Sequence, residues 1–218
     1  YPIHALGTAL DAVAGAAEKI ALDVSLLTQT EVGELAEPSA PGMGESSSMP
    51  HKRNPVRSAL IRGAARQVHG HAGVLMNASA QPLERGLGEW HSEWSPLVES
   101  ALLVEGMLEQ VAVLLEGVDV YPEAMRHNLA ATGGGIMAER ATRLLAPLLG
   151  PEVARSVSAE AAETARLESR AYPDVLADYR GVIEQVSLAD LHAACDPASY
   201  LGSSRHQIQR AKDWLIAG

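Results

Sequence analysis

The segment spanning residues 46–55 concentrates side chains that can move a proton and hold a negative charge; it reads Ser-Ser-Ser-Met-Pro-His-Lys-Arg-Asn-Pro. A serine hydroxyl can exchange a proton with carbon only where a dry, electropositive site favours its deprotonated form. Lys52 and Asn54 can supply that field through a fixed cation and an amide donor. The pattern predicts an active-site segment that acts on an anion.

The residues around this segment predict a loop that leads into a helix. Residues 37–44 are rich in Pro, Gly and Ser, which is typical of a long exposed loop able to close over a substrate. Asn54 is placed to cap the next helix, and Pro55 suits its first position. An anion at that helix start would meet backbone donors together with Lys52 and Arg53. On composition alone, however, a serine-rich loop with nearby cations is ordinary solvated surface.

The composition excludes several classes of protein. The 218 residues carry 17 Lys and Arg against 27 Asp and Glu, a net charge of −10, so we expect no nucleic-acid partner. The single cysteine, Cys195, excludes an internal disulfide and suits a cytoplasmic protein, and it is expected to be a small buried apolar residue. No apolar run reaches membrane-spanning length, so no membrane partner is expected. The sequence starts at Tyr1 without a Met, and we expect a fragment or a processed chain.

Hydrophobic periodicity predicts an all-α fold without strands. Apolar residues recur at steps of three and four over residues 5–35, 55–78 and 95–116, so three long helices should form an antiparallel bundle. After Val118 the predicted helices are shorter and are separated by Gly and Pro. We therefore expect a bundle domain over residues 1–118, with the signature loop at 37–54, and a small all-helical domain over residues 119–218.

Two further patterns favour structural roles. The run Thr132-Gly133-Gly134-Gly135 lacks the Lys-Ser/Thr continuation of a phosphate-binding loop, so it predicts a turn before a helix. His69 and His71 are two residues apart and do not share a helix face, so the sequence predicts no metal site.

The segment 46–55 resembles the signature G-S-S-x-M-P-x-K-x-N-P of the fumarase/aspartase superfamily. The matching positions are Ser46, Ser47, Met49, Pro50, Lys52, Asn54 and Pro55. Glu45 stands where the signature has Gly. Glu resists some backbone angles that Gly allows, and it places a carboxylate beside Ser46.

The resemblance implies a fold, an assembly and site residues. It implies a long central helical bundle, a small all-helical C-terminal domain and a homotetramer with shared active sites, of which this chain would be roughly the second half. Histidines from the missing part would complete the site, so the fragment alone should be inactive or weak. The implied catalytic residues are Ser46, Lys52 and Asn54, with Ser47 as the alternative serine. Ser47, Met49 and Arg53 are the expected substrate-binding residues, and neither a metal nor an organic cofactor is expected.

Longer stretches are similar to the 3-carboxy-cis,cis-muconate cycloisomerases of this superfamily, which act in aromatic-acid breakdown by the β-ketoadipate pathway. These stretches are residues 83–94, residues 125–134 with 137–139, and Asp196-Pro197 with Tyr200-Leu201-Gly202. Adenylosuccinate lyases typically carry Arg where this chain has Trp94. The resemblance implies a small polycarboxylate substrate and its conversion to a carboxymuconolactone. Adenylosuccinate lyase or another fumarate-releasing lyase remains an alternative, as does a non-catalytic helical assembly protein.

Overall fold

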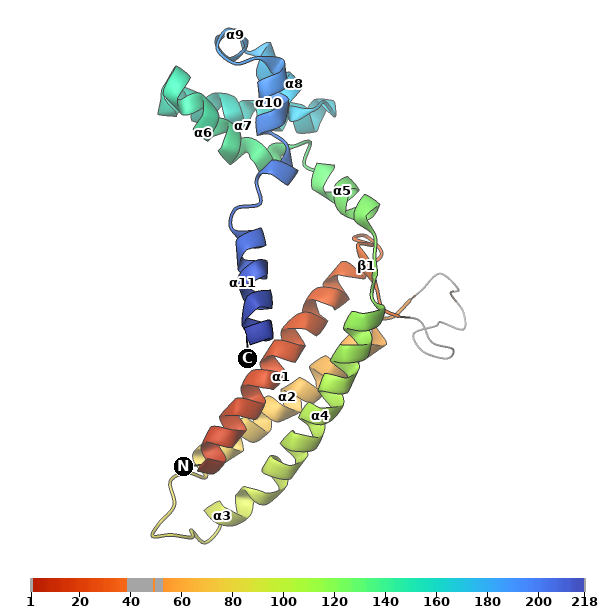
Figure 1. Ribbon diagram of the computed structural model, residues 1–218, viewed down its shortest axis with the longest axis vertical. Helices are drawn as coiled ribbons and strands as arrows, with labels where there is room; N and C mark the ends of the chain where they lie inside the picture. Colours follow the sequence, from red (N-terminus) through yellow and green to blue (C-terminus); the bar gives the residue numbers. More distant parts are fainter. Residues whose placement is uncertain (1, 39–48, 50–52, 218) are drawn as a thin grey trace. The chain divides into compact units, whose positions relative to one another are not determined.

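The computed structural model describes residues 2–38, 49 and 53–217 and shows an all-α fold in two compact units, Tyr1–Met125 and Arg126–Gly218 (Figure 1). Helices account for 75% of the residues and strands for 2%, which confirms the predicted fold class. The two units divide inside the helix α5 (Pro122–Ala130). The boundary at residue 118 stays a prediction of the sequence analysis.

The N-terminal unit is built on three long helices, α1 (Pro2–Leu27), α2 (Val56–Asn77) and α4 (Trp94–Gly117), with the short α3 (Glu89–Ser92) before α4. The bounds of α2 and α4 agree with the periodicity to within one residue. The first helix is shorter than the sequence predicted, because the chain turns after Leu27, where the Glu34 N–H donates to the Leu27 carbonyl and Gly33 takes a positive φ of 59°. Among the described residues, no helix is long and apolar enough to cross a membrane.

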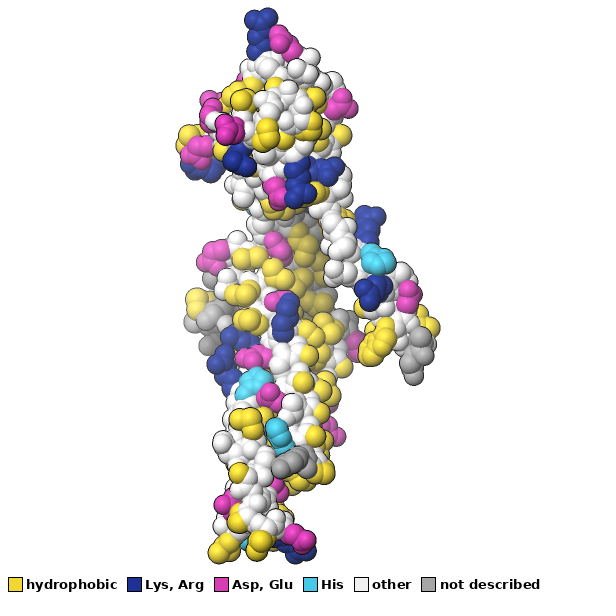
Figure 2. Space-filling view, turned by 90° about the vertical axis from the view of Figure 1, so that its left-hand side faces the viewer, with side chains coloured by type: hydrophobic (Ala, Val, Ile, Leu, Met, Phe, Trp, Pro, Cys, Tyr) yellow, Lys and Arg dark blue, Asp and Glu magenta, His cyan; other side chains and the backbone are white. Residues whose placement is uncertain are grey.

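Small side chains dominate the core between these helices, which lets the backbones approach closely. The core residues are Ala14, Ala17, Ala21, Val24, Ile61, Ala65, Val68, Val104, Met107 and Leu114. Several larger residues that periodicity placed on the apolar faces are exposed instead, including Leu6 on α1, Leu60 on α2 and Leu102 on α4. Hydrophobic side chains consequently cover much of the surface of these helices (Figure 2). The periodicity identified the apolar residues but not which of them this single chain buries.

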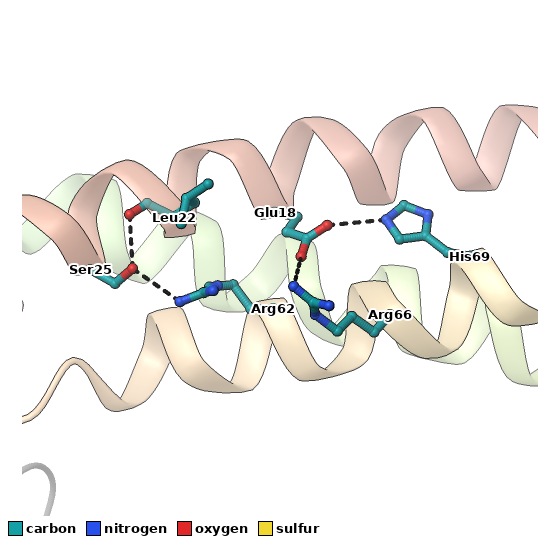
Figure 3. A network of polar contacts seen from close by, with 6 residues as sticks. All are labelled: Glu18, Leu22, Ser25, Arg62, Arg66 and His69. Carbon is teal, nitrogen blue, oxygen red and sulfur yellow. Dashed lines mark hydrogen bonds and ion pairs between the residues drawn. The ribbon is translucent and has the colours of Figure 1, made fainter.

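A seam of polar contacts joins α1 to α2 (Figure 3). The His69 ring lies between two carboxylates of α1, with Nδ1 2.5 Å from Asp11 Oδ1 and Nε2 3.2 Å from Glu18 Oε2. These partners raise the pKa of His69, with the Asp11 hydrogen bond as the largest cause. His71 instead faces α4, where its Nε2 lies 3.3 Å from Glu99 Oε2. The two histidines therefore point to different helices, as their spacing predicted.

The structure adds one feature that the sequence analysis missed, a minimal antiparallel pair of β1 (Leu35–Ala36) with β2 (Asp119–Val120). Leu35 pairs with Val120, and the Tyr121 N–H donates to the Glu34 carbonyl at 2.9 Å. Two residues are too few to show the alternation that predicts a strand. The pair ties the chain after α1 to the end of α4, directly before the signature loop.

The C-terminal unit consists of short helices. They are the later part of α5, α6 (Ala138–Leu149), α7 (Pro151–Glu168), α8 (Tyr172–Asp178), α9 (Arg180–Ile183), α10 (Leu188–Ala194) and α11 (Ser204–Ala217), with 3₁₀ turns η1 (Gly135–Met137) and η2 (Pro197–Ser199). Local signals set several ends. Pro151 follows Gly150 at the start of α7, and Ser187 Oγ caps α10 by accepting from the Asp190 N–H.

Tyr172 lies at the centre of the C-terminal core and is 1% exposed. Its hydroxyl donates to the Ser158 carbonyl at 3.1 Å, and burial raises its pKa. The glycine turn passes against this ring, with Gly134 at φ 90°, where a Cβ would lie 2.8 Å from Tyr172 Cβ. The predicted turn before a helix is thus confirmed, and so is the buried Cys195, which is 8% exposed.

Candidate active site

Some of the predicted site residues belong to the described residues, and others do not. Ser46, Ser47 and Lys52 lie outside the described residues, as does Glu45. Met49 is 40% exposed, and Arg53 and Asn54 are exposed immediately before α2. What the structure shows in detail is how the two ends of the signature loop are held.

Glu37, at the first end of the loop, binds the start of α2 at the second end. Its Oε1 accepts hydrogen bonds from the Ser58 N–H at 2.8 Å and from Ser58 Oγ at 2.6 Å. Its Oε2 accepts from the Arg57 N–H at 2.9 Å. A carboxylate at this place satisfies N–H groups that have no partner within the helix, and it lies at the positive end of the helix dipole. The residues that flank the segment 39–52 are therefore fixed to each other by one side chain.

This arrangement corrects two expectations about the helix start. Pro55, and not Asn54, is the N-cap residue of α2, and its side chain makes no capping hydrogen bond. The N–H groups of Arg57 and Ser58 are taken by Glu37, and the Val56 N–H donates to the Asn54 carbonyl at 2.9 Å. An anionic substrate consequently cannot use these backbone donors, because an internal carboxylate already holds them.

Two further contacts brace the base of the loop. The guanidinium of Arg57 donates through Nη1 to Gln110 Oε1 at 2.6 Å, which joins the start of α2 to α4. Gly117 lies at the end of α4 against the ring of Pro38, and a Cβ at Gly117 would come within 2.7 Å of Pro38 Cβ. The close approach requires a glycine, so the chain enters the loop at a fixed place on α4.

Aromatic side chains gather where α3 meets α4. The rings of Trp90 and Trp94 meet edge to face at 5.0 Å, and His91 lies 4.9 Å from Trp94. Arg85 stacks on Trp90 with its guanidinium carbon 5.5 Å from the ring centre. Trp90 is 36% and Trp94 52% exposed, so these rings pack on each other at the surface and do not belong to the core of this unit.

Sequence reasoning missed the role of Glu37, which it treated as part of a flexible loop. The carboxylate acts on residues 20 and 21 positions away, and no spacing rule joins residues so far apart. The one available signal was a Glu that directly precedes a Pro at the edge of a helix-to-helix connection.

No group of three or more His, Cys, Asp or Glu residues is placed to hold a metal ion within residues 2–38 and 53–217.

Comparison with known proteins shows which family this chain resembles. The Lyase family matches residues 3–70. The 3-carboxy-cis,cis-muconate cycloisomerase of Pseudomonas aeruginosa is 43% identical over 93% of this chain, and the nitrosuccinate lyase of Streptomyces davaonensis is 42% identical over 96%. The chain belongs to the fumarase/aspartase superfamily. The chain spans about half the length of the curated relatives it matches: it covers 44% of each of these two relatives.

Solved structures agree with the assignment of this chain to the superfamily. The crystal structure of 3-carboxy-cis,cis-muconate lactonizing enzyme from Pseudomonas putida matches with a TM-score of 0.85 at 42% identity. The match covers 96% of this chain and 47% of that one. The resemblance expected from the signature motif is therefore confirmed at the level of the superfamily.

Proposed function

We propose that the whole protein is a 3-carboxy-cis,cis-muconate cycloisomerase that forms a carboxymuconolactone. The observation that carries this proposal is the set of muconate cycloisomerases at 38–44% identity, which match this chain across its signature motif and its C-terminal unit. Because the chain is acidic, a small polycarboxylate can bind only where local positive groups attract it. Lys52 and Arg53 of the signature loop supply such groups. We place the reaction in the cytoplasm.

The proposed reaction is an intramolecular conjugate addition. One carboxylate oxygen of the substrate attacks the β carbon of a double bond, and the electrons of that bond move toward a second carboxylate to give an enediolate-like species. A proton then bonds to the α carbon, and the lactone results without gain or loss of atoms other than that proton. Catalysis requires donors at the carboxylate where charge accumulates and an acid at the carbon.

The signature residues take these roles in the proposal. Ser46 exchanges the proton with the α carbon, and Ser47 is the alternative for this step. The Lys52 ammonium and the Asn54 amide stabilise the charge on the second carboxylate. Met49 and Arg53 contact the substrate. The base of the loop, held by Glu37, determines where this segment meets the bundle.

We further propose that the protein is a homotetramer with shared active sites. Large apolar side chains on the bundle helices stay exposed in the single chain, among them Leu6, Leu26, Leu60, Met76 and Leu102. Exposed apolar surface of this extent on long helices is typical of surfaces that helices of other subunits cover.

A second candidate is elimination from a substituted succinate. The nitrosuccinate lyase relative is as similar to this chain as the cycloisomerases are. The same residues would then remove a proton α to a carboxylate while nitrite leaves the neighbouring carbon, which leaves a butenedioate. An adenylosuccinate lyase is also among the relatives, at 31% identity. Trp94 replaces the Arg of its pattern, which disfavours a nucleotide substrate.

A substrate panel with the full-length protein tests the proposal. Carboxymuconate should lose its dienoate absorbance, while nitrosuccinate should release no nitrite and adenylosuccinate no fumarate. Nitrite or fumarate release without cycloisomerisation would transfer the assignment to a lyase. If no compound of the panel binds or turns over, the result favours the non-catalytic helical assembly protein.

A further inference from the structure

The C-terminal unit contains a cavity of about 750 Å³, and its described lining residues all belong to this unit. Its walls come from the end of α5, the glycine turn, the junction of α7 with α8, and the Cys195–Ala198 segment. Much of the lining is apolar, as in Leu129, Ile136, Ala165 and Pro173. This volume and lining are typical of a site for a small organic molecule.

Guanidinium groups outnumber carboxylates in the lining of this cavity. Three arginines, Arg126, Arg166 and Arg170, line it together with one carboxylate, Asp196. The Asp196 carboxylate already accepts from the Ala198 N–H at 2.9 Å. The lining itself holds three guanidinium groups and one carboxylate, and it favours an anion wherever a guanidinium keeps donors that its carboxylate partners do not use.

Two of the guanidinium groups retain donors. Arg166 donates through Nε and Nη2 to Glu163, and Arg170 donates through Nη1 to Glu168 and Asp178. Within the described part of the chain, Arg166 Nη1 and Arg170 Nε and Nη2 make no hydrogen bond. The carboxylates that hold the two arginines do not line the cavity. They fix the guanidinium groups at its wall and leave N–H groups for a ligand carboxylate.

Part of the cavity is lined by the packed core of this unit. Tyr172 and Cys195 are both buried members of the core of this unit and also line the cavity. The turn at Gly134 is fixed against Tyr172, as described above. A preformed cavity of this kind costs little ordering when a ligand enters.

We propose that this cavity binds a small organic acid, with its apolar body against the Leu129 and Ile136 wall and its carboxylate on Arg166 and Arg170. The shape and charge of the cavity carry this inference, and it does not rest on the proposed cycloisomerase activity. The ligand class follows from the lining: an apolar body alone would leave the guanidinium donors without a partner, and a small hydrophilic anion would leave the apolar walls wet.

The experiment uses benzoate as the probe and the full-length protein. Calorimetric titration should give a dissociation constant on the order of 1 mM, which is reasonable for so small a ligand. Benzyl alcohol, which lacks the carboxylate, and acetate, which lacks the apolar body, should each bind at least roughly 10-fold more weakly. Bound benzoate should also slow the reaction of Cys195 with methyl methanethiosulfonate, followed by peptide mass spectrometry.

Matched variants locate the binding. The double variant Arg166→Gln with Arg170→Gln should weaken benzoate binding about 10-fold or more, while Arg155→Gln on the exposed face of α7 should leave it unchanged. Ala130→Trp, which fills the cavity from the end of α5, should abolish binding, and Ala159→Trp should not. Circular dichroism checks that each variant is folded. If Ala130→Trp does not fold, the double arginine variant alone decides whether benzoate binds in the cavity.

The proposal is overturned if benzoate fails to bind, or binds the arginine and Ala130 variants as well as it binds the wild type. It is also overturned if saturating benzoate leaves the Cys195 reaction rate unchanged. None of these readouts uses turnover, so the result is independent of whether the protein is a cycloisomerase.

Discussion

Replacing Glu37 with alanine should release the start of α2 from the chain that precedes the signature loop. The substitution removes all three hydrogen bonds that this carboxylate accepts, two from Ser58 and one from the Arg57 N–H. Ser58 is fully buried, so water cannot readily replace the lost partner. The loss should therefore exceed that of an ordinary surface cap.

The magnitude follows from the kind of contacts removed. Loss of a helix cap costs about 0.5–2 kcal/mol, and a hydrogen bond to a charged group contributes about 1.5–3 kcal/mol, though such terms are not additive. We expect Glu37→Ala to lower the free energy of unfolding by about 3 kcal/mol. Glu37→Gln keeps one oxygen for Ser58 but turns an NH₂ group toward the Arg57 N–H, and it should cost roughly half as much.

Denaturant unfolding of the full-length protein at a fixed protein concentration measures the change, with the exposed Glu31→Ala as control. Hydrogen exchange gives a local readout, because the amides of Arg57 and Ser58 should be protected in the wild type and exchange rapidly in Glu37→Ala. If Glu37→Ala behaves like the control and both amides stay protected, the described role of Glu37 is wrong.

Two other substitutions test the helix seam and the glycine turn. Asp11 and Glu18 raise the pKa of His69 above 6.5, so its stabilising contribution is fully present below about pH 6.5 and is lost as the pH rises through the folded-state pKa. Because the side chain is 37% exposed, His69→Gln should cost only roughly 0.5 kcal/mol in acid and nothing in base, and a difference that is constant with pH in denaturant unfolding would contradict this. Gly134→Ala should lower the free energy of unfolding by about 1–3 kcal/mol, since the residue has a φ of 90° and its Cβ would meet Tyr172. Thermal denaturation measures that change, and an unaltered midpoint would argue against the close approach.

The positions of the main helices were readable from the sequence. The three- and four-residue spacing located α2 and α4, and the glycine run at residues 132–135 ended α5 as expected. These features depend on neighbours within a few residues, where periodicity and turn preferences act. The signature at Ser46–Pro55 identified the superfamily because its residue types and order are specific.

The features that the sequence did not predict depend on contacts between distant segments. Glu37 reaches the start of α2 across the loop, and the two-residue β1–β2 pair joins positions more than 80 residues apart. Periodicity also placed Leu60 and Leu102 on apolar faces, yet both are exposed in the single chain. The pattern identifies the apolar side chains, and it does not say which of them this chain buries.

The most direct test of the proposed activity compares two serine variants of the full-length protein in the carboxymuconate assay. Ser46→Ala should abolish the loss of dienoate absorbance while the protein still binds substrate, because the carbon then has no acid from which to take its proton. Ser48→Ala, at a position that the superfamily signature leaves open, should keep near wild-type turnover. Unchanged turnover in Ser46→Ala would contradict the assignment of the proton transfer to this residue.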